Sequence, residues 1–412
     1  MNQQDGVTQT SLRSLLSAEG RRDPNPFYAE LHRQGPVCLL PDPSDRFDVV
    51  VHGYDAVHQA LRDPALHVMT SDYPDRRGGR LWRAHPALRV LVSSIFFMEG
   101  DLHTTVRRLF SQAFSARRVA ALEPAVERIV ARRLDKLAEL GAGGKTVDLL
   151  ADFALPVPSD VVGELLGVPE NDRDWFPERV RAFGAILDLG AGVWRFQKAA
   201  DKAAEDLTGY FHELVAKRRA EPRDDLVSAL VADEDVELDD DVLVANLLTM
   251  YNGGFVTTSH LIGNSVRILL DDPEEKARVL ADPERADGFI QEVLRCEPPT
   301  HFSIRWAAED TEVAGVPITK DSRVLVLLGA ANRDPAKFTD PDTFDPGRDE
   351  GQPLSFSAGM HYCLGAVLTK LESKVAVPML LRRFPDLALA GEPGARTTLM
   401  LRGYESLPVR VT

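Results

Sequence analysis

One long apolar segment, residues 241–270, constrains the fold of this chain more than any other part of the sequence. Its apolar residues predict one continuous helix, which ends at Asp271-Asp272-Pro273 because proline removes a backbone donor and clashes with the preceding turn. At 1.5 Å per residue this helix would be roughly 45 Å long. A helix so long and so apolar must be central and buried. We therefore expect a mainly helical protein, with a small sheet near the N-terminus where the β-branched run 47–51 precedes a short helical pattern over residues 54–61.

Composition excludes several classes of function. The chain has 412 residues and a formal net charge of −15, which does not suit nucleic acid as a partner. Its three cysteines, Cys38, Cys296 and Cys363, lie far apart, so neither a disulfide framework nor a zinc site is indicated. No unbroken apolar run of about 18 residues is present, since polar residues interrupt even segment 241–270, and the N-terminal residues lack an export signal. We expect a cytoplasmic protein without a membrane anchor.

Two adjacent glycines, Gly253 and Gly254, lie inside the long helical segment. In a helix interior each costs roughly 1 kcal/mol relative to alanine, so another requirement must place them there. Close approach of a ligand is one explanation, because Gly253 and Thr257 share a helix face and would offer a bare patch beside a hydroxyl. Close crossing of a second helix is the alternative.

A glycine-bracketed loop, residues 356–365, carries Cys363 just before a helical pattern over residues 364–381. Backbone N–H groups of a tight loop and the positive end of a helix lower the pKa of a thiol, which would make Cys363 an anionic ligand for iron. Gly359 and Gly365 would let the backbone lie close to a flat ring. His361 would meet a charge at the edge of that ring. An inert buried cysteine is the alternative.

The cysteine loop resembles the haem-binding signature of the cytochrome P-450 superfamily, which reads Phe, Gly, any, Gly, any, His or Arg, any, Cys, any, Gly. Phe356, Gly359, His361, Cys363 and Gly365 match, and Ser357 stands in place of the first glycine. Serine is small enough to keep the loop tight. The resemblance implies one b-type haem with Cys363 as the axial ligand of its iron.

The glycine pair resembles the family's oxygen-binding helix motif, Ala or Gly, Gly, any, an acid, Thr, Thr. Gly253, Gly254, Thr257 and Thr258 match, but Val256 occupies the place of the acid. In the family the acid and the following threonine relay protons to dioxygen. Here the proton would come through Asn252, His260 or a polar group of the substrate; alternatively, the acid is dispensable and Val256 merely packs.

Two further sets of residues match family motifs. Glu292 and Arg295 form a Glu-x-x-Arg helix motif, and with Arg348 they are expected to make a buried network that holds the cysteine loop. His103 and Arg107 lie one helical turn apart, and together with Arg305 and His361 they are expected to bind the haem propionates.

The resemblance covers the chain from about residue 25 to its end. It implies a polar N-terminal extension over residues 1–25 and a single domain over residues 26–412, a mainly helical triangular prism with a small β lobe. It also implies electron supply from a separate ferredoxin and ferredoxin reductase.

Three functions remain open. A monooxygenase that hydroxylates or epoxidises a hydrophobic small molecule, in tailoring a secondary metabolite, is the leading interpretation. A haem oxidase that couples aryl groups or forms rings without inserting oxygen is the second, and a haem-bearing recruitment module without turnover is the third.

Substrate choice is expected to lie in five segments that wall the pocket in the family: residues 71–98, 183–196, 247–257, 300–304 and 399–404. Their predicted pocket residues are mostly apolar, which favours a hydrophobic substrate: Trp82, Phe96, Leu248, Asn252, Phe302, Ile304 and Met400. The first segment also holds five arginines, Arg76, Arg77, Arg80, Arg83 and Arg89. These would steer a carboxylate-bearing or carrier-protein-bound substrate, or else pair with nearby acids.

Overall fold

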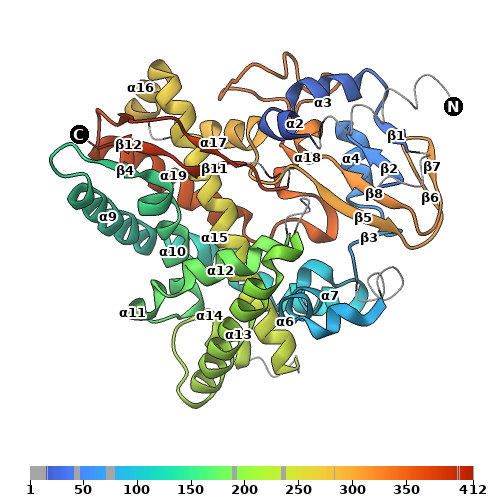
Figure 1. Ribbon diagram of the computed structural model, residues 1–412, viewed down its shortest axis with the longest axis horizontal. Helices are drawn as coiled ribbons and strands as arrows, with labels where there is room; N and C mark the ends of the chain where they lie inside the picture. Colours follow the sequence, from blue (N-terminus) through green and yellow to red (C-terminus); the bar gives the residue numbers. More distant parts are fainter. Residues whose placement is uncertain are drawn as a thin grey trace. The chain divides into compact units, whose positions relative to one another are not determined.

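The computed structural model describes residues 15, 17–40, 47–70, 79–187, 193–232, 238–282, 284–396, 398 and 400–411 (Figure 1). The chain forms two compact units, each assembled from three segments. The first unit comprises Met1–Val68, Glu274–Cys363 and Gly394–Glu405, and the second comprises Met69–Pro273, Leu364–Pro393 and Ser406–Thr412.

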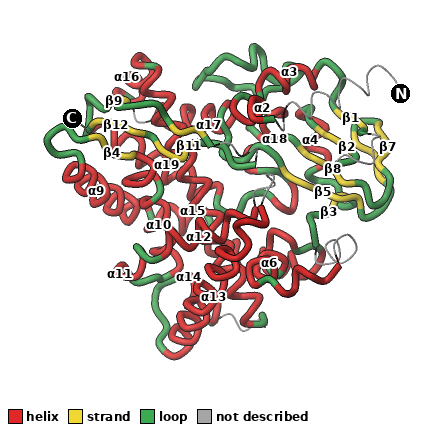
Figure 2. The backbone as a smooth tube through the Cα atoms, viewed as in Figure 1, coloured by secondary structure: helices red, strands yellow, loops and turns green. Residues whose placement is uncertain are grey.

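The first unit contains the predicted β lobe, a five-stranded sheet in the order β1-β2-β8-β5-β3 (Figure 2). The strands are β1 (Val37–Leu39), β2 (Val49–Val51), β8 (Arg323–Val326), β5 (Ser303–Ala307) and β3 (Leu66–His67). Strand β2 covers only the second half of the predicted run 47–51, and it pairs in parallel with β8, Val50 opposite Leu325. All three valines of β2 are buried, because the sheet packs against helix α4 (Tyr54–Ala60).

The helices of the first unit are short. Besides α4 they are α2 (Ala18–Arg22), α3 (Asn25–His32), α16 (Pro273–Ala281), α17 (Arg285–Cys296) and α18 (Leu328–Ala331). The hairpin β6 (Thr311–Val313) and β7 (Val316–Ile318) and the strands β10 (Gly394–Ala395) and β11 (Tyr404–Ser406) complete its regular structure. Helix α2 lies within the predicted N-terminal extension, and Arg402 holds its end by donating to the backbone carbonyls of Arg21 and Arg22.

The second unit is built around α15 (Asp240–Asp271), the helix predicted over residues 241–270. Helices α10 (Pro156–Leu166), α13 (Gln197–Ala220) and α19 (Ala366–Arg383) pack against it, and most of its side chains are buried. Asp239 caps its start by accepting the Asp241 N–H at 2.8 Å. Pro273 follows its end, as expected. No helix in the described part of the chain is long and apolar enough to cross a membrane.

The remaining elements of the second unit follow in chain order. The helices are α6 (Pro86–Val92), α7 (Gly100–Ala113), α8 (Ala116–Ala121), α9 (Glu123–Leu140), α10 (Pro156–Leu166), α11 (Glu170–Arg173), α12 (Phe176–Gly184), α13 (Gln197–Ala220), α14 (Leu226–Val231) and α19 (Ala366–Arg383). A three-stranded sheet in the order β4-β12-β9 joins β4 (Thr146–Asp148), β12 (Pro408–Arg410) and β9 (Ala388–Leu389).

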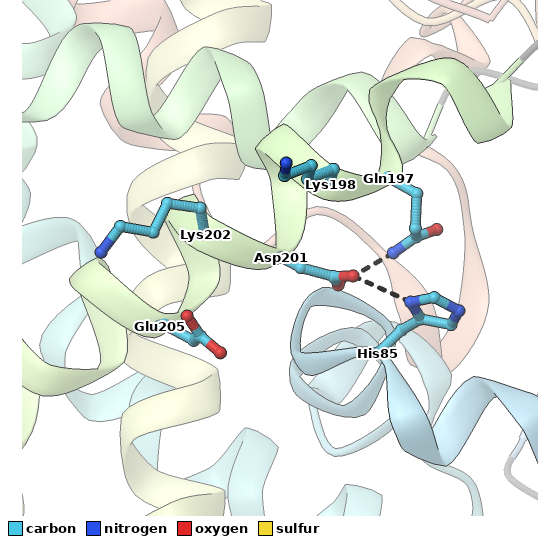
Figure 3. Close-up of a pocket in the computed structure, with 6 residues that line it drawn as sticks. All are labelled: His85, Gln197, Lys198, Asp201, Lys202 and Glu205. Atoms are coloured by element: carbon cyan, nitrogen blue, oxygen red, sulfur yellow. Dashed lines mark hydrogen bonds and ion pairs between the residues drawn. The ribbon is translucent and has the colours of Figure 1, made fainter.

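A carboxylate on α13 caps the start of α6 from outside (Figure 3). Asp201 accepts the Ala87 N–H at 3.1 Å, the Gln197 amide at 2.9 Å and the His85 Nδ1 at 2.8 Å. These groups lie at the edge of a surface cavity of about 550 Å³ lined by His85, Gln197, Lys198, Asp201, Lys202 and Glu205. Burial opposes ionisation of Asp201, but the three hydrogen bonds outweigh it and hold the pKa of this carboxyl below its usual range. The first turn of α6 therefore depends on α13 for its cap.

We predict that Asp201→Asn lowers the free energy of unfolding by about 1 kcal/mol at neutral pH, since it weakens the hydrogen bonds that an anionic cap makes. A carboxyl with a lowered folded pKa contributes stability above its unfolded pKa of about 3.9 and loses it as pH falls through the folded value. The difference between Asp201→Asn and wild type should therefore vanish in acid. Urea unfolding at several pH values measures it.

Glu205→Gln is the matched control, because Glu205 is an exposed acid on the rim of the same cavity and makes no bond to α6. An equal loss of stability in both variants would mean that net charge on α13, rather than the cap, is responsible.

Candidate functional site

The loop that carries Cys363 is closed by backbone hydrogen bonds in the first unit. The Cys363 N–H donates to the Phe356 carbonyl at 2.8 Å, and short 3-10 turns over Leu354–Phe356 and Gly359–His361 shape the chain between them. Cys38 and Cys296 are buried, whereas Cys363 is half-buried. Cys363 is thus the cysteine that a ligand can reach.

Ser357 has a backbone conformation that only glycine adopts readily. Its φ is +65° and its ψ is −166°, which costs of order 1–3 kcal/mol for a residue with a Cβ. Its hydroxyl oxygen is buried and has no hydrogen-bond partner within the described ranges. Small size alone therefore does not explain how serine replaces the first glycine of the motif.

The two matched glycines of the loop have different roles. Gly359 has a φ of +69°, and a Cβ there would come within 2.6 Å of the Leu61 carbonyl, so glycine is required for packing against the end of α4. At Gly365 a Cβ would meet no atom within 4 Å. The open space at Gly365, the reachable thiol and the unpartnered Ser357 hydroxyl fit a bound haem.

Arg295 and Glu292 form a bidentate ion pair on α17. The Nε and Nη2 of Arg295 lie 2.8 Å and 2.7 Å from the two Glu292 oxygens, and both side chains are almost fully buried. Arg348 Nε lies 3.5 Å from Glu292 Oε1, so the structure brings the three predicted network residues together. Arg295 also donates to the backbone carbonyls of Asn332, Pro341 and Thr343, which attaches the following loop to α17.

Asn332 connects this network to the cysteine loop. Its side-chain Oδ1 accepts the Leu354 N–H at 2.7 Å, and its Nδ2 donates to the Ser355 hydroxyl at 2.8 Å. The sequence motifs do not single out Asn332, and its complete burial is the property that reveals its role. Arg295, Asn332 and Leu354 thus form a continuous chain of contacts that ends at the loop before Cys363.

The glycine pair of α15 serves two purposes, both within the second unit. At Gly254 a Cβ would lie 2.8 Å from Val162 Cγ2, so this glycine allows the close crossing of α10. At Gly253 a Cβ would lie 3.2 Å from the ring of Phe96, whose side chain is 39% exposed. The helix-crossing alternative accounts for Gly254, and the ligand explanation for Gly253 stays a prediction.

Thr257 keeps its hydroxyl on the same helix face as Gly253. The hydroxyl donates to the Gly253 carbonyl at 2.7 Å, so its oxygen remains able to accept a hydrogen bond. Val256 is buried and has no ionisable group. Of the alternative proton donors, Asn252 and His260 are both almost fully buried, and Asn252 packs against Gly184 at the end of α12.

A buried acid that sequence reasoning missed lies on α19. Burial raises the pKa of Glu372 well above its usual range, because removal from water disfavours the charged carboxylate. Thr369, three residues earlier, makes a hydroxyl contact of 3.0 Å with Thr258 of α15. The signal in the sequence was an acid that shares a helix face with Leu368, Thr369 and Ala376, all of them buried.

The predicted propionate ligands are divided between the units. His103 and Arg107 lie on α7 of the second unit, His103 buried and Arg107 half-buried. Arg305 lies on β5 of the first unit and donates to the Ile304 carbonyl at 2.9 Å, and His361 lies in the cysteine loop. The assignment of the four residues to the haem propionates stays a prediction.

The predicted pocket residues also come from both units. In the second unit, Leu248 of α15 is fully buried, whereas Phe96 is exposed and Trp82 is half-buried. In the first unit, Phe302 is buried and Ile304 and Met400 are half-buried. Residues 71–78, 188–192 and 399 of the predicted pocket segments lie outside the described residues.

Two arginines of the basic segment already have partners in the structure. Arg83 lies over the Trp82 ring, 5.0 Å from its centroid, and Arg89 donates to the Arg83 carbonyl at 2.7 Å. Arg76, Arg77 and the side chain of Arg80 lie outside the described part. The steering role of these arginines stays a prediction.

Comparison with known proteins gives a consistent result. The family model described as Cytochrome P-450 matches residues 12–388. The chain is 37% identical to 6-deoxyerythronolide B hydroxylase of Saccharopolyspora erythraea, with 93% of this chain and 95% of that protein covered. Among solved structures, P450BioI in complex with an acyl carrier protein ligated to hexadec-9Z-enoic acid superposes with a TM-score of 0.87 at 31% identity, covering 96% and 99%. The cytochrome P-450 enzyme CxnD, for C–S bond formation in chuangxinmycin biosynthesis, has a TM-score of 0.84 at 33% identity, covering 94% of each chain.

The two glycines of α15 should respond differently to alanine. Gly254→Ala inserts a methyl group into the α10 crossing, and the overpacking should lower the free energy of unfolding by about 1–3 kcal/mol. Gly253→Ala presses only on the mobile edge of Phe96, so the gain of about 1 kcal/mol in helix propensity should balance the contact. Urea unfolding of the two variants compares them, and Phe96→Leu/Gly253→Ala is the control that removes the contact. A larger loss at Gly253 than at Gly254 would reverse these assignments.

Proposed function

Because the chain belongs to the cytochrome P-450 family, we propose that it is a monooxygenase that hydroxylates or epoxidises a hydrophobic small molecule in the tailoring of a secondary metabolite. Members of this family are haem-thiolate enzymes, and the family membership makes the chain an oxidoreductase. The observation that carries the proposal is the Thr257 hydroxyl, held on the Gly253 face of α15 with its oxygen free to accept a hydrogen bond. The 6-deoxyerythronolide B hydroxylase relative supports oxygenation as the reaction type.

The residues of the chain would share the work as follows. A haem supplies O–O cleavage and oxidation of carbon when a cysteine thiolate ligates its iron, and Cys363 would be that ligand. Phe356, Gly359 and Gly365 would shape the loop under the ring. The propionates would be held by His103, Arg107, Arg305 and His361, whose positive or donor groups suit carboxylates.

Proton supply must differ from the motif of the family, since Val256 cannot ionise. Thr257 would accept a hydrogen bond from a water or a substrate group and keep that donor beside the oxygen-binding face. The Asn252 amide can orient a water but does not ionise, so His260 or a polar group of the substrate would release the proton.

The substrate would be an apolar molecule. It would reach the enzyme either free or bound to a carrier protein. The apolar residues proposed to line the pocket are Trp82, Phe96 and Leu248 of the second unit and Phe302, Ile304 and Met400 of the first. P450BioI is described with an acyl carrier protein, which supports a carrier-bound or carboxylate-bearing substrate as the finer possibility. Arg83 and Arg89, the described arginines of the basic segment, would face the acidic carrier protein or the substrate carboxylate.

The proposed partners follow from the family. A ferredoxin and its reductase would deliver two electrons per turnover, as the family membership implies. Dioxygen is the other substrate. A cytoplasmic location is part of this proposal.

Oxidative coupling without oxygen insertion is the second candidate. Val256 favours it, since such chemistry depends less on proton delivery to oxygen. The likeness to CxnD, described as forming a C–S bond, supports it.

Titration of the ferric protein tests the substrate class. Macrocycles, hydrophobic acids, aromatic peptides and carrier-bound acyl chains are added in turn while the Soret band is followed. A low-spin to high-spin shift should appear with hydrophobic ligands, and products from turnover under ¹⁸O₂ should gain one labelled oxygen. Products that lose hydrogen and gain no label would support the coupling enzyme instead. A protein that takes up no electrons with any ligand would fit a recruitment module.

Thr257→Ala should raise peroxide release at the expense of product by roughly tenfold or more, as expected when a group acting in proton transfer is removed. Thr257→Ser is the matched control, because it keeps the hydroxyl and should stay close to wild type. Peroxide formed per electron pair consumed is the measurement. Equal coupling in Thr257→Ala and wild type would remove this role from Thr257.

A further inference from the structure

Ser357 combines two unfavourable features in the loop that carries Cys363. Its backbone lies at φ +65° and ψ −166°, a region in which glycine is the ordinary residue. Its hydroxyl is buried and, among the residues the structure describes, has no hydrogen-bond partner. Buried polar groups of native proteins are nearly always hydrogen-bonded, so the partner is to be sought in what the protein binds.

The loop places Ser357 next to Cys363. The carbonyl that accepts the Cys363 N–H at 2.8 Å belongs to the peptide group joining Phe356 to Ser357. Ser357 and Cys363 are therefore attached to the two ends of one backbone hydrogen bond, and a turn of the Ser357 side chain is what would bring its unpartnered hydroxyl to the sulfur. The Ser357 N–H donates to the Leu354 carbonyl at 2.8 Å, so the hydroxyl is the donor that Ser357 still has to offer.

We propose that the Ser357 hydroxyl donates a hydrogen bond to the Cys363 sulfur when that sulfur ligates haem iron, and that this bond tunes the iron. The proposal rests on the proposed function only in requiring haem with Cys363 as its ligand. A ligated thiolate keeps negative charge and attracts a buried O–H donor more strongly than a neutral carbonyl does. A hydrogen bond to sulfur withdraws charge from the metal and so favours the reduced iron.

This assignment also explains why the strained position holds serine. Glycine would relieve the backbone and keep the loop tight, but it has no hydroxyl. Serine leaves the backbone strained at this position, but it supplies a hydrogen-bond donor for the proposed iron ligand. Ser357 would then be a positioning residue that acts through Cys363 and touches no substrate.

Three variants separate the hydroxyl from the backbone. Ser357→Ala removes the hydroxyl and keeps the strained Cβ, whereas Ser357→Gly removes both. Ser355→Ala is the matched control, because the Ser355 hydroxyl has protein partners, donating to the Leu294 carbonyl and accepting from Asn332. All three are compared with wild type as haem-loaded full chains.

The midpoint potential of the ferric/ferrous couple and the unfolding midpoint are the two measurements. Ser357→Ala and Ser357→Gly should each disfavour reduction about tenfold, which is about 59 mV for a one-electron couple. Ser357→Gly should unfold later than Ser357→Ala, since it relieves the strain. Ser355→Ala should lower the unfolding midpoint and leave the potential unchanged.

An unchanged potential in both Ser357 variants would overturn the proposal and point to a buried water as the partner. A shift in Ser357→Gly alone would also overturn it, because backbone strain would then be the cause. Should Ser357→Ala fail to fold, Ser357→Gly still decides between a shifted and an unchanged potential. The measurement needs neither substrate nor turnover, so a failure of the proposed oxygenation would leave it standing, whereas a wild-type spectrum without thiolate ligation would remove both.

Discussion

The bidentate pair between Arg295 and Glu292 is the interaction on which the cysteine loop depends. Both groups are almost fully buried, where an ion pair is stable only if its remaining hydrogen-bonding positions are satisfied. Arg295 meets this condition by donating to three carbonyls of the loop that follows α18, and the Asp345 N–H donates to Glu292. Removing either partner would leave a buried charge, at a cost of about 3–5 kcal/mol.

The contacts of Arg295 and Asn332 extend to the loop of Cys363, the proposed iron ligand, but none of them is made to the Cys363 side chain. The side-chain carbonyl of Asn332 accepts the Leu354 N–H, and two residues later the Phe356 carbonyl accepts the Cys363 N–H. A soft ligand on an exposed loop would otherwise vary in position, and the effect of a thiolate on iron depends on its geometry and hydrogen bonds. The buried charges thus act as a rigid support.

The parts of the molecule that local pattern determines were predictable from the sequence. The prediction of helix α15 is within one residue of the observed helix at each end. It is this close because a long, mainly apolar segment and a terminal proline are local signals. The grouping of Glu292, Arg295 and Arg348 followed from the resemblance to the family's motifs. The packing of Gly254 on α10 and the burial of Glu372 were not predictable, because each depends on neighbours far away in the chain. A single sequence shows which residue types recur at a given spacing. It does not show which face of a helix another helix will cross.

The parallel pairing of β2 with β8 has a consequence for synthesis of the chain. Val51 lies opposite Val326, and every residue of the long central helix is made between them. At ribosomal speeds of about 5–20 residues per second, β2 can pair with β1 at once, but its other edge waits roughly 15–55 s for β8. Throughout that time the β-branched strand, which is buried in the finished fold, has one unpaired edge that can pair with other chains. Expression yield in vivo should therefore depend on holding chaperones more than the stability of the finished protein would suggest.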